Sequence, residues 1–203
     1  MGRERRASTG VIVGGLVLAA ALASVAAMSV RGPHAEPVRV IHGDGYVVPF
    51  SFADQIHFPG NTIMARVIVL EVRPARYMDQ RADGLGESVY VPILVRVVAS
   101  YAGELQTGST LVLRALGGTA EGVRFETNMA PSADVKSVGA EFIVFGSDPT
   151  FVADEESPAL TPSGWFAIRG DHLVDRTLAA MPPDAVEDAG VSLSVAESLM
   201  SNR

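Results

Sequence analysis

The sequence predicts an all-β domain, either a sandwich or a barrel, on three observations. Apolar and polar residues alternate with a period of two in several runs, most clearly over residues 109–115 and 122–127. Turn-forming glycines separate these runs at short intervals. Hydrophobic residues make up 48% of the chain and charged residues 19%, a composition that excludes a disordered protein. We therefore expect one globular domain with one targeting or anchoring segment.

The anchoring segment is expected near the N-terminus. Residues 11–30 contain no charged residue and no proline, and as a helix they would span about 30 Å, the thickness of the hydrocarbon core of a bilayer. Arg3, Arg5 and Arg6 precede them, so we expect residues 1–10 to stay in the cytoplasm and the body to be exported. The segment is either a retained transmembrane helix or a cleaved signal peptide, because small residues late in the run fit a cleavage pattern.

The remaining elements follow in order. Residues 31–59 carry several prolines and glycines, which indicates a linker, with a short helical turn at 51–56. The β domain should cover residues 60–176. The extension, residues 177–203, should contain a short helix over 195–201 that is capped by Ser194 and Glu197. The expected strands are 62–72, 88–101, 109–115, 122–127, 141–145, and a hairpin of 165–168 with 173–174.

Charge and cysteine content exclude several classes of function. The 203-residue chain has a net charge of −7, and because residues 1–30 carry +2, the body carries −9. An acidic body argues against nucleic acid and against an anionic membrane surface as partners. The chain contains no cysteine, which excludes disulfides, cysteine-ligated zinc and thiol catalysis.

No catalytic, metal-binding or cofactor motif rises above background. We therefore expect no catalytic residue, no metal and no cofactor. Asp79, Asp83 and Glu87 have a spacing that could surround a calcium ion, but they lack the alternating oxygen ligands of a calcium loop. Solvated loop carboxylates are the simpler interpretation.

One cluster is a candidate for binding a partner. Arg73, Arg76, Tyr77 and Arg81 follow the first long strand, in what we expect to be a loop. Arg and Tyr are enriched among the residues that dominate binding energy at interfaces. These four residues are the predicted partner-binding site, and an ordinary solvated loop is the alternative.

Strand and glycine motifs recur through the body in a fixed order, at residues 64–76, 95–97, 101–105, 108–118, 122–123, 139–145 and 164–166. Over roughly residues 60–176 this order resembles a group of exported bacterial proteins. The resemblance implies a small OB-like β-barrel of five to seven strands, similar to netrin/metalloproteinase-inhibitor modules. The chain departs from that pattern at Ala102, where a basic residue is usual, and it lacks the cysteines through which the inhibitors act. Protease inhibition therefore cannot be carried over.

The function that we expect is non-enzymatic. The protein would be a membrane-tethered or secreted module outside the cytoplasm that binds an envelope or extracellular protein. The alternative is an exported hydrolase with an unrecognised active site. An enzyme should show a pocket with converging polar groups, whereas a binding module should show an exposed apolar or Arg/Tyr patch.

Overall fold

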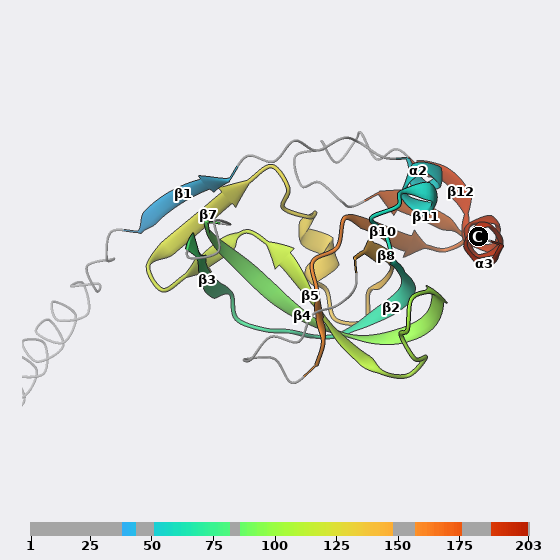
Figure 1. Cartoon of the computed structure of the whole chain (residues 1–203), viewed down its shortest axis with the longest axis horizontal. Helices are drawn as coiled ribbons and strands as arrows, with labels where there is room; N and C mark the ends of the chain where they lie inside the picture. Colours follow the sequence, from blue (N-terminus) through green and yellow to red (C-terminus); the bar gives the residue numbers. More distant parts are fainter. Residues whose placement is uncertain (1–37, 44–50, 82–85, 148–156, 176–187, 203) are drawn as a thin grey trace, which may run out of the picture. The chain divides into compact units, whose positions relative to one another are not determined.

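The computed structural model describes residues 38–43, 51–81, 86–147, 157–175 and 188–202 (Figure 1). Arg39–Arg203 form one compact unit. The expected anchor, residues 11–30, lies outside the described residues. Within the described ranges, neither α-helix has the length and apolar character needed to cross a bilayer.

The described residues form a mostly β structure. The strands are β1 (Arg39–Gly43), β2 (Ile63–Val72), β3 (Arg76–Gln80), β4 (Gly86–Ala102), β5 (Thr110–Leu116), β6 (Gly118–Ala120), β7 (Val123–Thr127), β8 (Glu141–Gly146), β9 (Ala159–Leu160), β10 (Gly164–Arg169), β11 (His172–Asp175) and β12 (Asp188–Ser192). The helices are α2 (Phe52–His57), α3 (Leu193–Ser201) and a 3₁₀ helix, Ala133–Lys136. One sheet has the order β1-β7-β6, the other the order β12-β11-β10-β8-β2-β4-β5-β9, with β3 paired to β4.

The sheets are open, so the closed barrel of five to seven strands that the resemblance implies is wrong. β9 pairs in parallel with β5, and β10 pairs antiparallel with β8. Residues 161–163, between β9 and β10, belong to no strand. Pro162 has no backbone N–H to donate to a neighbouring strand, which favours a break at this point.

Five of the described strands lie where the sequence predicts none: β1, β3, β6, β9 and β12. β1 lies in the expected linker and pairs in parallel with β7, from Arg39 opposite Val123 to Gly43 opposite Thr127. β3 lies in the expected loop, and β12 lies in the expected extension. β1 depends on a partner more than eighty positions away, so local sequence patterns carry little signal for it.

The two short helices that the sequence predicts are present. Ser51 caps α2 in a reciprocal capping box with Asp54. α3 begins earlier than predicted, because the hydroxyl of Ser192, rather than that of Ser194, accepts the first-turn N–H of Val195. In Figure 1, α2 and α3 lie near β11 and β12, at the end of the unit away from β1 and β7.

The large sheet has a buried core on each side. Alternate residues of β2, β4, β5 and β8 point to one side and form the larger cluster, which includes Val67, Ile93 and Leu113. On the other side, α2 and α3 cover Met64, Ile143, Phe145 and Phe166. The rings of Phe52, Phe145 and Phe166 pack edge to face, with centroids 5.1–5.6 Å apart.

Candidate functional site

The candidate site lies on the outward side of β4, which pairs with β5 along one edge and with β2 and β3 along the other. Successive side chains of a strand point to opposite sides of the sheet. Val91, Ile93 and Val95 point into the larger core, so Tyr90 and Pro92 point outward. Although it points outward, Tyr90 is only 4% exposed.

Arg114 covers this tyrosine. It stands opposite Pro92 in the register of β4 and β5, and therefore on the same side of the sheet. Its guanidinium carbon lies 5.6 Å from the centre of the Tyr90 ring, within cation–π distance. The Nε and Nη2 atoms of Arg114 are buried, and no described residue offers either of them a hydrogen-bond acceptor. Since a buried donor without an acceptor costs about 1–3 kcal/mol, folding alone does not favour this arrangement.

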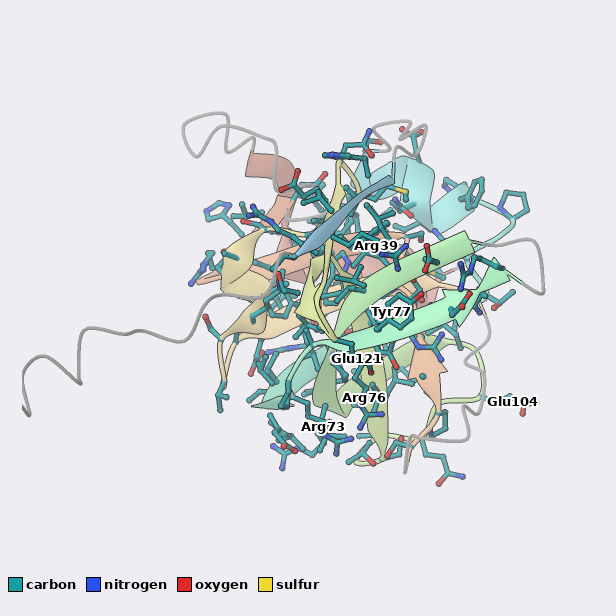
Figure 2. All side chains as sticks on the ribbon, turned by 90° about the vertical axis from the view of Figure 1, so that its left-hand side faces the viewer. Arg39, Arg73, Arg76, Tyr77, Glu104 and Glu121 are labelled. Atoms are coloured by element: carbon teal, nitrogen blue, oxygen red, sulfur yellow. The ribbon has the colours of Figure 1, made fainter. Side chains whose placement is uncertain are left out.

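Two of the predicted partner-binding residues stand on the same side. The N–H of Arg73 donates to the carbonyl oxygen of Pro92 at 2.9 Å, and Arg76 stands opposite Tyr90. Arg73 Nε also contacts Glu71 Oε2 at 3.4 Å. Figure 2 shows Arg73 and Arg76 together on the side of the unit that faces the viewer. We call three side chains the arginine face: Arg73, Arg76 and Arg114.

The other two predicted residues, Tyr77 and Arg81, belong to a separate cluster, the Glu87 network. The Tyr77 hydroxyl donates to Glu87, and Arg39 of β1 donates to both Glu87 oxygens at 2.7 and 2.8 Å. Arg81 donates to both oxygens of Asp79, from Nε at 2.8 Å, and its Nη1 lies 3.8 Å from Glu87. The predicted patch is divided because Arg76 and Tyr77 are neighbours in one strand and therefore point to opposite sides of it.

The Glu87 network neutralises Asp79 and Glu87, two of the three carboxylates whose spacing in the sequence could surround a calcium ion. Hydrogen bonds from Arg39 and Tyr77 lower the pKa of Glu87 to about 2. Hydrogen bonds from Arg81 likewise lower the pKa of Asp79 to about 2. Both carboxylates thus bind guanidinium groups. In the part of the chain that the structure describes, no three His, Asp or Glu side chains gather as a metal site.

A second cluster of polar residues joins α3 to the sheet. Arg66 of β2 donates to Glu141 Oε2 from Nε at 3.1 Å and from Nη2 at 2.6 Å, and its Nη1 reaches Glu197 of α3 at 3.2 Å. The Tyr101 hydroxyl donates to the same Glu197 oxygen at 2.7 Å. Burial, together with this hydrogen bond, raises the pKa of Tyr101 above its ordinary range. We call this cluster the Glu197 network.

A pocket of about 390 Å³ opens beside the Glu197 network, lined in part by Ile168 and Leu193. The charged side chains that line it are Arg66, Glu141 and Arg169. Arg66 and Glu141 pair with each other, and Arg169 reaches Asp134 at 3.0 Å. The pocket therefore presents charges that are already neutralised by neighbours, rather than groups converging on a substrate.

The residue that sequence reasoning missed is Arg114. The period of two over residues 109–115 sets Arg114 opposite the apolar positions of its strand, so the sequence places it on the outer side. It does not show which strand lies alongside. Comparison of the chain with models of protein families, with curated proteins and with solved structures finds no match.

Proposed function

We propose that this protein is a non-enzymatic binding module outside the cytoplasm, which holds an envelope or extracellular protein through the arginine face. The observation that carries the proposal is the set of three arginines on one side of the sheet, one of which has two buried N–H groups without an acceptor. Sites that bind are commonly left less stable than packing would allow. Aromatic and arginine side chains are also the types that dominate binding energy at interfaces.

The location outside the cytoplasm rests on the N-terminal sequence. Residues 11–30 would hold the module at the membrane as a single transmembrane helix, or would direct its secretion and be cleaved. The acidic body suits a protein partner better than a nucleic acid.

A relationship to OB-type modules of the netrin group is part of the proposal. The neighbouring order β10-β8-β2-β4-β5 and the parallel contact of β9 with β5 support it. This relationship concerns strand order only, since the sheets are open. The relationship implies no catalytic or inhibitory activity for this chain.

The second candidate, an exported hydrolase, would use the pocket beside the Glu197 network. A hydrolase needs a group that can accept or donate a proton at the reacting atom. Glu141 is the carboxylate that lines that pocket, and Nε and Nη2 of Arg66 already donate hydrogen bonds to it. The paired state of this carboxylate favours the binding module.

Chemical crosslinking and capture from the cells that make the protein test the binding function. The full chain should capture a reproducible protein partner. The double variant Arg73→Ala/Arg76→Ala should lose most of that capture, whereas the matched variant Arg124→Ala, on β7 of the other sheet, should retain it. Equal capture by the wild-type chain and the double variant, or no reproducible partner, contradicts the proposal.

Export is tested with a single cysteine, because the native chain has none. Thr107 is exposed between β4 and β5, so Thr107→Cys should leave the fold unchanged. An impermeant maleimide should label it on intact cells. Labelling only after lysis contradicts export, and the intact mass of the mature chain decides between a retained anchor and a cleaved signal.

A further inference from the structure

The two unpaired nitrogens of Arg114 lie on one edge of its guanidinium group. Nε–H and one N–H of Nη2 point in the same direction, and this side-on edge is the one on which a carboxylate or a phosphate accepts two parallel hydrogen bonds. Both atoms are buried, with no acceptor among the described residues. The unsatisfied groups are therefore a matched pair with the shape of an oxyanion site.

The same edge is filled at two other arginines of this protein. Arg81 donates from Nε and Nη2 to the two oxygens of Asp79, and Arg66 donates from Nε and Nη2 to Glu141. In each case a carboxylate occupies the edge. Arg114 offers the equivalent edge without such a group.

The surroundings of Arg114 favour a negative ligand. The Arg114 guanidinium carbon lies over the Tyr90 ring at 5.6 Å from its centre, within cation–π distance. Arg73 and Arg76 stand on the same side of the sheet, across β4 from Arg114. Arg96 follows further along β4 and is exposed. Glu71 offsets part of the charge of Arg73. Because the arginines share one side of the sheet on an otherwise acidic body, they attract a local negative group more strongly than an extended polyanion.

Access requires a local movement. The two nitrogens are covered in the structure, so an incoming oxygen reaches them only when the Arg114 side chain turns outward from Tyr90 or a covering side chain moves aside. The covered state leaves two charged donors without an acceptor, which lowers the cost of such a movement. The ligand then supplies the two acceptors that the fold does not.

We infer that the side-on edge of Arg114 binds a carboxylate of an acidic segment of a protein partner, through two parallel N–H···O hydrogen bonds. Arg73 and Arg76 add attraction to neighbouring carboxylates of the same segment. This inference rests on the proposed function, because it names the chemistry that the arginine face recognises. It names carboxylate because the anionic side chains of a protein partner are carboxylates, the groups that also fill the matching edges of Arg66 and Arg81.

Nuclear magnetic resonance of the arginine Nε–H groups tests the inference on the full chain, ¹⁵N-labelled at arginine and kept in detergent if the N-terminal segment is retained. The probe is a tetraglutamate peptide with blocked ends, and inorganic phosphate is the second arm. The Arg114 Nε–H signal should shift and saturate with the peptide, and should shift much less with phosphate at the same concentration. Arg114→Lys keeps the positive charge but removes the two parallel N–H donors, and it should weaken peptide binding about tenfold. Arg124→Lys should bind as the wild-type chain does.

Three results overturn the inference: no shift of the Arg114 signal at saturating peptide, an equal shift with phosphate, or unchanged peptide affinity in Arg114→Lys. The titration of the wild-type chain tests the inference even if a variant fails to fold. Capture that depends on Arg73 and Arg76 without any response at Arg114 leaves the proposed function intact and refutes this inference alone. Binding of the peptide at Arg114 without any captured partner refutes the proposed function alone.

Discussion

At the level of single residues, the arginines that the structure describes include two contrasting kinds. Arg39, Arg66 and Arg81 each donate to carboxylates at hydrogen-bond distance, and the hydrogen bonds of Arg39 and Arg66 join neighbouring elements. Arg114 instead lies over an aromatic ring with one edge unpaired among the described residues. The first kind contributes to stability, whereas the unpaired donors of Arg114 cost stability.

This difference predicts opposite effects of the same substitution. Arg66→Met leaves Glu141 and Glu197 without their cation and should lower the free energy of unfolding by about 1–2 kcal/mol. Arg114→Met removes two unsatisfied donors and should leave stability within about 1 kcal/mol of wild type, or raise it. Denaturant unfolding measures both, and an Arg114→Met protein less stable than Arg66→Met contradicts the assignment.

Tyr101 should ionise at a higher pH than an ordinary tyrosine. Burial disfavours its phenolate, and the hydrogen bond to Glu197 holds the proton in place, so both raise its pKa. An ultraviolet absorbance titration should show a late step that Tyr101→Phe removes. Glu197→Gln should move that step to lower pH but leave it above the ordinary range, because burial remains; an unmoved step contradicts the role of Glu197.

At the level of elements, β1 is held to the rest of the unit by the Glu87 network as well as by β7. Arg39, at the start of β1, binds Glu87 on β4, and its backbone N–H donates to the carbonyl of Gly122 at 2.8 Å. In β1, Val40 is almost half exposed and Ile41 is only partly buried, so the strand buries little apolar surface of its own. The ion pair between Arg39 and Glu87 therefore contributes much of the attachment of β1 to the rest of the unit.

This attachment should weaken in acid. The pKa of Glu87 falls from an ordinary value of 4.5 to about 2 in the folded protein. A lowered pKa means that the stabilisation is fully present above the unfolded value and is lost as the pH falls from about 4.5 towards 2. Hydrogen exchange at the β1 amides should speed up over this interval, while exchange at β2 changes less. In Glu87→Gln the β1 amides should exchange fast at neutral pH and respond less to acid; wild-type behaviour there contradicts the role of Glu87.

The elements that sequence reasoning predicted share one property, which is that their signal is local. β5 and β7 alternate apolar and polar residues, β2 and β4 are long runs rich in β-branched residues, and α2 carries its own capping box between Ser51 and Asp54. β1 and β3 escaped prediction because each is short and gains its hydrogen bonds from a distant or already paired strand. Glu197 was predicted to cap α3 together with Ser194, but because Ser192 is the N-cap, Glu197 lies beyond the capping position and pairs with Arg66 instead.

The candidate site was half predictable for the same reason. Arg73 and Arg76 stand out in the sequence as a cluster, and the structure places both on the arginine face. Tyr77 and Arg81 do not join them, since the sequence could not show that a strand, rather than a loop, carries residue 76 and residue 77 to opposite sides. Arg114 lies more than thirty positions further along, and only the pairing of β4 with β5 brings it beside Tyr90.

At the level of the whole unit, the two larger buried clusters share their strands. Neighbouring residues Met64 and Ala65 point into different clusters, as do Trp165 and Phe166. Neither cluster can lose its strands without the other, so the body should unfold in one cooperative transition.

That cooperativity can be measured with the single tryptophan. Trp165 reports on the larger cluster by fluorescence, while circular dichroism reports on all strands and helices. Phe166→Ala creates a cavity in the other cluster and should cost about 3–5 kcal/mol. It should move both transitions by the same amount, and separated transitions would show that the clusters unfold independently.

The parallel pairing of β1 with β7 has a mechanical consequence. A pull on the chain ahead of Arg39 enters the folded unit at the first residue of β1, where the Arg39 guanidinium and backbone N–H are both held. The load falls first on these contacts and on the β7 ladder, before it reaches β2 and the core strands. If the N-terminal segment tethers the protein, β1 is therefore the element that detaches first under tension, while the arginine face keeps its structure.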